Sequence, residues 1–161
     1  ETDQVVDELV VGIQPTSLVL DKNNKLWTIT DGGYEGSPYG HEAPSLYCID
    51  AETFTIEKQF RFRFGDAPSE VQLNAAGDML YWINDDIWAM SVDADRPPVR
   101  PFLPSNGTIY YGLTISPHNG DVYIADAIDY VQQGKIYRYS SDGELIDEFY
   151  AGIIPGAFCW K

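Results

Sequence analysis

The sequence predicts an all-β fold, a β-propeller of four-stranded antiparallel blades. The first observation is a glycine turn leading into an alternating apolar strand, which occurs at Gly12, Gly65, Gly107 and Gly152. A repeat of about 40–50 residues with this content is typical of propeller blades. The second is composition, because 14 Gly and 10 Pro divide 161 residues into short apolar runs without a helical period. The third is a hydrophobic content of 44%, which is enough for a core.

The first predicted blade covers 12–64, and its strands lie at 17–20, 25–30, 45–50 and 55–64. The second covers 65–106, with strands at 70–73, 79–84, 87–92 and 99–103. The third covers 107–151, with strands at 112–116, 122–126, 135–140 and 144–150. Turns rich in Asn, Asp and Gly separate these strands, as tight antiparallel hairpins require. Each blade is therefore expected to be an antiparallel meander.

Residues at equivalent positions of the three blades share chemistry. The second strands carry Trp27, Tyr81 and Tyr123, and the third strands carry Leu46, Ile87 and Ile136. A single meander cannot bury both of its faces, so repeated apolar positions indicate that neighbouring blades stack. We therefore expect the same face of each blade to pack on the next one.

Further strands are predicted at 4–11, before the first blade, and at 153–161, after the last. Each would belong to a partial blade of one domain over 1–161. The chain is thus expected to be the C-terminal half of a larger propeller, with three complete and two partial blades. Exposed blade edges promote association. The rest of the propeller or a second copy of the chain is expected to cover them.

Charge and cysteine content exclude several kinds of partner. Ten basic and 25 acidic residues give a net charge of −15, which would repel a nucleic-acid backbone. No apolar stretch is long enough for a transmembrane helix. Cys48 and Cys159 lie in apolar strand patterns without the spacing of metal ligands. We predict two separate buried thiols and no metal site, with a disulfide as the alternative.

The longest predicted connection, 31–44, is rich in glycine and carries Tyr34, Tyr39 and His41, whereas the equivalent connection of the second blade is only Asp85 and Asp86. Aromatic faces supply contact area at low entropic cost, and histidine can bond or coordinate. A ligand-binding loop is one interpretation. A loop whose tyrosines cover a blade edge is the other.

Two further segments are candidates for ligand binding. Tyr110 and Tyr111 replace the proline of the repeat at the entrance to an innermost strand, where they are expected to project toward the central channel. Core packing is the alternative for one of them. The loop 127–133, which carries Asp129 and Tyr130, corresponds to the long loop 31–44 and is expected on the same face.

No catalytic motif is present, so we predict neither catalytic residues nor a cofactor. His41 and Glu42 are adjacent, and in an extended chain their side chains point apart. A hydrolase or lyase is the alternative to a binding protein. It would require His41 to meet acids such as Asp31, Glu35 or Asp129 in a cleft.

The Gly-x-x-Pro spacing, the segment SLYCIDAET at 45–53 and the segment GIIPGAFCWK at 152–161 resemble the YncE-like β-propeller surface lipoproteins of Bacteroidetes. That group includes surface cobalamin-binding lipoproteins that work beside a TonB-dependent transporter, and its members look like seven-bladed rings. The resemblance implies an exported protein at the outer-membrane surface, lipid-anchored through a segment outside this sequence. It further implies capture of a small nutrient such as a corrinoid. A structural surface-layer or protein-docking propeller is a further alternative.

Overall fold

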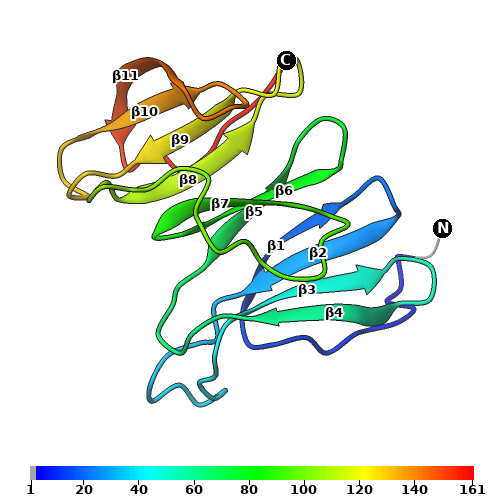
Figure 1. Cartoon of the computed structure of the whole chain (residues 1–161). Helices are drawn as coiled ribbons and strands as arrows, with labels where there is room; N and C mark the ends of the chain where they lie inside the picture. Colours follow the sequence, from blue (N-terminus) through cyan, green and yellow to red (C-terminus); the bar gives the residue numbers. More distant parts are fainter. Residues whose placement is uncertain (1–2) are drawn as a thin grey trace.

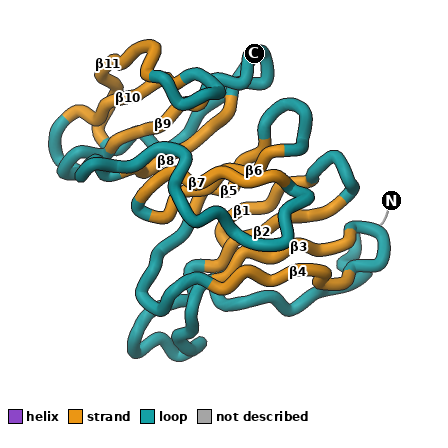
Figure 2. The backbone as a smooth tube through the Cα atoms, viewed as in Figure 1, coloured by secondary structure: helices purple, strands orange, loops and turns teal. Residues whose placement is uncertain are grey.

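The computed structural model describes residues 3–161 and consists of strands and loops, as Figure 2 shows; residues 1 and 2 of the predicted domain lie outside this range. Three antiparallel sheets follow one another along the chain (Figure 1). The first contains β1 (Pro15–Leu20), β2 (Lys25–Thr30), β3 (Ser45–Asp50) and β4 (Thr55–Arg61). The second contains β5 (Ser69–Leu73), β6 (Met79–Asn84) and β7 (Asp86–Ser91). The third contains β8 (Tyr110–Ile115), β9 (Val122–Asp126), β10 (Gln133–Tyr139) and β11 (Leu145–Ile153).

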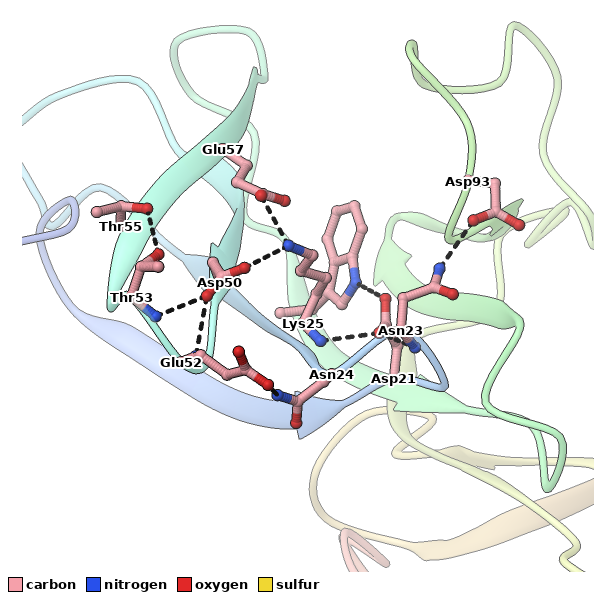
Figure 3. Close-up of polar contacts among 11 residues, drawn as sticks. Asp21, Asn23, Asn24, Lys25, Asp50, Glu52, Thr53, Thr55, Glu57 and Asp93 are labelled. Carbon is pink, nitrogen blue, oxygen red and sulfur yellow. Dashed lines mark hydrogen bonds and ion pairs between the residues drawn. The ribbon is translucent and has the colours of Figure 1, made fainter.

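A buried carboxylate closes the turn between β1 and β2 (Figure 3). Asp21 Oδ2 accepts the indole N–H of Trp27 at 2.8 Å, and Oδ1 accepts the backbone N–H groups of Asn23 at 2.8 Å and Lys25 at 2.9 Å. Lys25 Nζ lies 2.6 Å from Asp50 and 2.7 Å from Glu57. The Lys25 ammonium therefore ties β2 to β3 and β4.

The sheets stack through the faces that the repeat predicts. Trp27 and Leu46 are fully buried in a cluster that the first sheet shares with the second. Tyr81 and Ile87 occupy the matching positions one sheet later, and they lie in the cluster between the second and third sheets. Equivalent side chains therefore face the next sheet in both cases, which is the arrangement that stacked blades require.

The chain end covers the corresponding face of the third sheet. Trp160 packs on Tyr123 with ring centroids 5.2 Å apart, and its indole N–H donates to Thr114 Oγ1 at 3.1 Å. Ile136 is only 4% exposed. Residues 154–161 form no strand, so the strand predicted at 153–161 is wrong; β11 ends at Ile153. The aromatic side chains of this segment pack edge-on against a sheet face instead of beside a strand edge.

The strand predicted at 4–11 is also wrong. Residues 4–11 belong to no strand, and Val5, Val6 and Val10 are at least 86% exposed. A strand needs a neighbour that pairs its backbone N–H and C=O groups, and no strand pairs with this segment. Leu9 and Val11 instead line a shallow cavity on the free face of the first sheet, beside β1.

The second sheet lacks the fourth strand predicted at 99–103. Only one bridge remains, between Ile87 and Leu103, and Val99 is 93% exposed. This segment contains Pro101, and prolines 97, 98 and 104 lie around it. Proline has no N–H to donate to a ladder, so it disfavours continuous pairing. The second sheet is therefore three-stranded.

The two cysteines are separate free thiols, as predicted. Cys48 is 2% exposed in the first core cluster, but Cys159 is exposed, so the prediction that both are buried is wrong for Cys159. The reason is that Cys159 lies in the covering segment and not in a strand. Within residues 3–161, no helix is long and apolar enough to cross a membrane.

Candidate binding site at the entrance of the inner strands

The inner strands β1, β5 and β8 lie side by side, β1 next to β5 and β5 next to β8. Ser17 Oγ accepts the backbone N–H of Val71 at 3.1 Å and links β1 to β5. The pairing register shifts at the start of each inner strand, so Thr16, Glu70 and Tyr111 fall at β-bulges. Bulges re-aim side chains and are frequent beside functional sites. Each sheet thus places one side chain of different chemistry at the same end of its inner strand.

The connections at this end differ in length. Residues 31–44 join β2 to β3 and residues 127–132 join β9 to β10, but only Asp85 separates β6 from β7. A cavity of about 530 Å³ lies beside this short turn. Its lining includes Ser69, Asp85, Ser105, Gly107, Tyr110 and Tyr130. The cavity size is within the usual range for small-molecule sites.

Aromatic side chains mark the mouth of this cavity. The rings of Tyr111 and Tyr130 meet edge to face with centroids 5.9 Å apart, and the two residues are 44% and 48% exposed. Tyr110 packs against the second core cluster and donates its hydroxyl to the carbonyl of Pro104 at 3.2 Å. Burial raises the pKa of the Tyr110 hydroxyl, so it stays a neutral donor. Of the two consecutive tyrosines, one therefore packs inward and the other is presented to solvent.

Asp129 orders the loop that carries Tyr130. Its Oδ1 accepts the backbone N–H groups of Val131 at 3.0 Å and Gln132 at 2.9 Å. These hydrogen bonds stabilise the carboxylate and lower the pKa of Asp129. Tyr130 itself has a φ of +63°. By holding the backbone of this loop in place, Asp129 positions the ring of Tyr130.

The long loop 31–44 forms a separate structure. Glu42 Oε1 accepts the N–H of Ile13 at 2.7 Å, and Gly33 bridges to His41. The ring of His41 packs on Phe64 with centroids 4.4 Å apart. Tyr34 and Tyr39, which are 60% and 86% exposed, do not line the cavity beside Asp85. The predicted ligand residues therefore divide into two groups. Those of the loop 31–44 lie away from the cavity, whereas Tyr110 and Tyr130 line it and Tyr111 packs against Tyr130.

Two of the three acids considered for catalysis, Asp31 and Asp129, are engaged elsewhere. Asp31 Oδ1 accepts the N–H of Gly33 at 2.8 Å, while Asp129 bonds within its own loop. Within residues 3–161, no carboxylate hydrogen-bonds to His41, and no three His, Cys, Asp or Glu side chains converge as metal ligands. The site offers aromatic surface, hydroxyl groups and one exposed carboxylate, that of Asp85. This is the chemistry of binding by stacking and hydrogen bonding.

Sequence reasoning missed Asp85 and Ser105, which line the cavity, and the bulge residue Glu70, which lines a different cavity together with Phe158. Glu70 has a φ of +58°, and burial raises the pKa of its carboxyl. The sequence feature that could have indicated Glu70 is its place in the repeat, one residue before the alternating apolar run of β5. Asp85 was noted only as a short turn, although a short turn between longer loops leaves room for a cavity. Ser105, whose N–H donates to Asp86 at 2.7 Å, carried no recognisable signal.

The stacked sheets are similar to several solved structures. One is a quinonprotein alcohol dehydrogenase-like protein from Bacteroides thetaiotaomicron, with 17% identity and a TM-score of 0.64 over 84% of this chain and 33% of that one. Another is a gluconolactonase from Xanthomonas campestris, with 17% identity and a TM-score of 0.60 over 92% and 51%. A third is the β-propeller domain of Swd1 from Myceliophteria thermophila, with 18% identity and a TM-score of 0.57 over 84% and 42%. No protein-family model and no curated protein matches the sequence.

These similarities confirm the predicted fold class. The chain is an all-β protein of the β-propeller type, built from antiparallel sheets that stack around their inner strands. It spans 33% to 51% of the length of these three structures. At 17% to 18% identity they show the fold alone. The number of blades in a complete ring stays a prediction.

Proposed function

We propose that this chain is a non-catalytic binding module that captures a small nutrient at the loop end of its inner strands. The carrying observation is the cavity of about 530 Å³ with Tyr110 and Tyr130 in its wall and Tyr111 against Tyr130. Exposed aromatic rings next to a few polar groups suit a ligand with flat apolar surface and polar edges. Asp85 and Ser105 supply those polar groups.

A corrinoid is the nutrient that we propose. Such a ligand is larger than the cavity, so part of it would enter beside Tyr130 and the remainder would lie across the loop end, where Tyr111 is exposed. The resemblance to YncE-like surface lipoproteins supports this choice.

The proposed setting is the outer-membrane surface of an exported, lipid-anchored protein. A TonB-dependent transporter is the proposed partner that would receive the nutrient. The net charge of −15 is unfavourable for contact with anionic lipids or nucleic acid. It is compatible with handing a ligand to another protein.

Isothermal titration calorimetry with cyanocobalamin, cobinamide, haem and a siderophore tests the proposal. We expect the corrinoids to bind, and the double variant Tyr111→Ala/Tyr130→Ala to weaken binding by about tenfold or more, because stacking on an aromatic ring contributes about 0.5–1.5 kcal/mol per pair beyond burial. Tyr150→Ala, on the 67% exposed Tyr150 of β11, is the matched control. A second double variant, Tyr34→Ala/Tyr39→Ala, measures whether the long loop contributes. If no corrinoid binds, or if the Tyr111→Ala/Tyr130→Ala variant binds as the wild type does, nutrient capture at this site is refuted.

A hydrolase is the second candidate, because a gluconolactonase is among the similar structures. It would need His41 to leave Phe64 and approach an acid such as Asp31. Proton release from gluconolactone measures this activity directly. Hydrolysis by the wild type that disappears in His41→Ala would favour the enzyme over the binding module.

A further inference from the structure

A second cavity lies on the other side of the Asp85 turn, between the first and second sheets. Its volume is about 320 Å³. Arg61 at the end of β4 and the next two residues, Phe62 and Arg63, line one side, while β6 and β7 supply Trp82 and Trp88. The prolines that prevent a fourth strand in the second sheet, at positions 97 and 98, also line this cavity. It therefore differs in position and lining from the cavity of about 530 Å³ that Tyr110 and Tyr130 line, which we call the tyrosine cavity.

Aromatic rings form one wall of this cavity. Trp82 and Trp88 are stacked with centroids 6.4 Å apart and an interplanar angle of 13°, and Phe62 packs against Trp82 at 6.4 Å. The Trp88 indole N–H donates to the carbonyl of Asn84 at 3.0 Å. The Trp82 indole N–H is buried and has no hydrogen-bond partner within residues 3–161. A buried donor without a partner is rare and costs stability.

Unpaired positive charge gathers beside these rings. The cations in ion pairs are Lys22, Lys25, Lys58, Lys135 and Arg138. Arg61 and Arg63 form no ion pair within residues 3–161, although the chain has 25 acidic residues. Both line the cavity. Two free guanidinium groups at one aromatic wall of an acidic protein are an anion-binding arrangement.

The lining also contains the carboxylates of Asp66, Asp85 and Asp86, two of which accept hydrogen bonds from uncharged donors. Asp66 Oδ2 accepts the backbone N–H of Arg63 at 3.0 Å and the side-chain amide of Asn84 at 3.3 Å. Asp86 Oδ1 accepts the N–H of Ser105 at 2.7 Å. The exposed Asp85 carboxylate is the remaining acid of this lining. Within residues 3–161 neither guanidinium group donates a hydrogen bond or forms an ion pair, so both keep their donors for another partner.

We propose that this cavity binds a small organic anion with a flat aromatic ring, an aromatic carboxylate. The guanidinium groups of Arg61 and Arg63 hold the carboxylate, since their planar forks match its two oxygens. The ring lies against the wall formed by Phe62, Trp82 and Trp88. This site does not depend on the proposed corrinoid site, because apart from Asp85 the two linings consist of different residues.

Calorimetric titration with naphthoate and its uncharged counterpart naphthamide tests the inference. Naphthoate should bind at least about tenfold more tightly than naphthamide, and added salt should reduce this preference. The double variant Arg61→Gln/Arg63→Gln should lose the preference, whereas Trp88→Leu should weaken both compounds. Arg100→Gln is the matched control, since Arg100 is exposed and does not line the cavity.

Thermal unfolding followed by circular dichroism verifies that each variant is folded. The Trp82 indole N–H provides an independent readout, because its nuclear magnetic resonance signal should shift with naphthoate in the wild type and in Arg100→Gln. Equal binding of the two compounds, no binding of naphthoate, or unchanged binding by Arg61→Gln/Arg63→Gln overturns the proposal. Loss of naphthoate binding only in Tyr111→Ala/Tyr130→Ala would place the anion in the tyrosine cavity, and this also overturns it.

Discussion

Replacing Asp21 by alanine should destabilise the first sheet strongly. Asp21 is 6% exposed and accepts three hydrogen bonds, one of them from Trp27, which is fully buried. The indole N–H cannot reach water after the change, which costs about 2 kcal/mol, and the two backbone bonds contribute about 1 kcal/mol each. The expected loss is about 4 kcal/mol. For a domain of this size that corresponds to a decrease in melting temperature of about 8–16 °C.

Calorimetric or urea unfolding of three variants measures this loss. Asp21→Asn keeps an oxygen for the backbone donors but turns an amide toward the indole of Trp27, so it should lose about half as much stability as Asp21→Ala. Asp142→Ala, at an exposed turn position, is the control and should change stability by less than about 0.5 kcal/mol. The reasoning is refuted if Asp21→Ala unfolds within about 1 kcal/mol of the wild type. It also fails if Asp21→Asn is as unstable as Asp21→Ala.

Three other predictions concern the thiols, an acid-sensitive pair and a glycine. A thiol reagent should label Cys159 rapidly and Cys48 only on unfolding, since burial raises the pKa of the Cys48 thiol to about 11; labelling of both in the native state would contradict this. The hydrogen bond from Lys25 holds the pKa of Asp50 below its ordinary value, so the stability difference between wild type and Asp50→Asn should be constant above about pH 5 and shrink as the pH falls through the folded pKa. Urea unfolding across this range measures that difference, and a pH-independent one would refute the coupling. Gly32→Ala should be more destabilising than Gly36→Ala, although both have φ above +80°, because an added Cβ at Gly32 would lie 2.2 Å from the Glu42 carbonyl and the one at Gly36 meets nothing within 4 Å. Equal melting temperatures of these two variants would contradict the clash.

The strands that could be predicted best are those with partners on both sides. The boundaries of β2, β3, β6 and β9 match their predicted ranges, because apolar alternation is strong there and turn residues limit each segment. Trp27, Leu46 and Ile87 were also matched correctly across the repeat, since equivalent core positions are occupied by similar side chains. Local pattern and tertiary packing agree in these places.

The errors concern strand pairing. Alternating apolar residues indicate that one face of a segment is buried, but they do not indicate that a strand edge is available for pairing. The segment with Phe158 and Trp160 buries its rings against the face that carries Tyr123, and so needs no edge. The segment around Val99 fails because its prolines remove donors.

Only part of the candidate site could be predicted from the sequence, because the folding of the loops decides where several of its side chains lie. Tyr110, Tyr111 and Tyr130 could be chosen from their place in the repeat and their chemistry. The loop 31–44 folds back on Ile13 through a hydrogen bond that Glu42 accepts, and this fold decides where Tyr34, Tyr39 and His41 lie. The residue type of Glu42 does not reveal that it accepts this bond. Bulges depend on the pairing register of two strands, so a single strand's sequence cannot locate them.

The bulges at Thr16, Glu70 and Tyr111 have an evolutionary consequence. When a blade is duplicated, its bulge is duplicated with it, and each copy places one side chain at the loop end of its inner strand. That side chain lies outside the regular pairing of its strand, so a substitution there can alter ligand chemistry while the cores around Trp27 and Tyr81 keep their packing. A hydroxyl, a carboxyl and a phenol already occupy the three equivalent positions. Selection can therefore change the chemistry at this end of the inner strands one blade at a time.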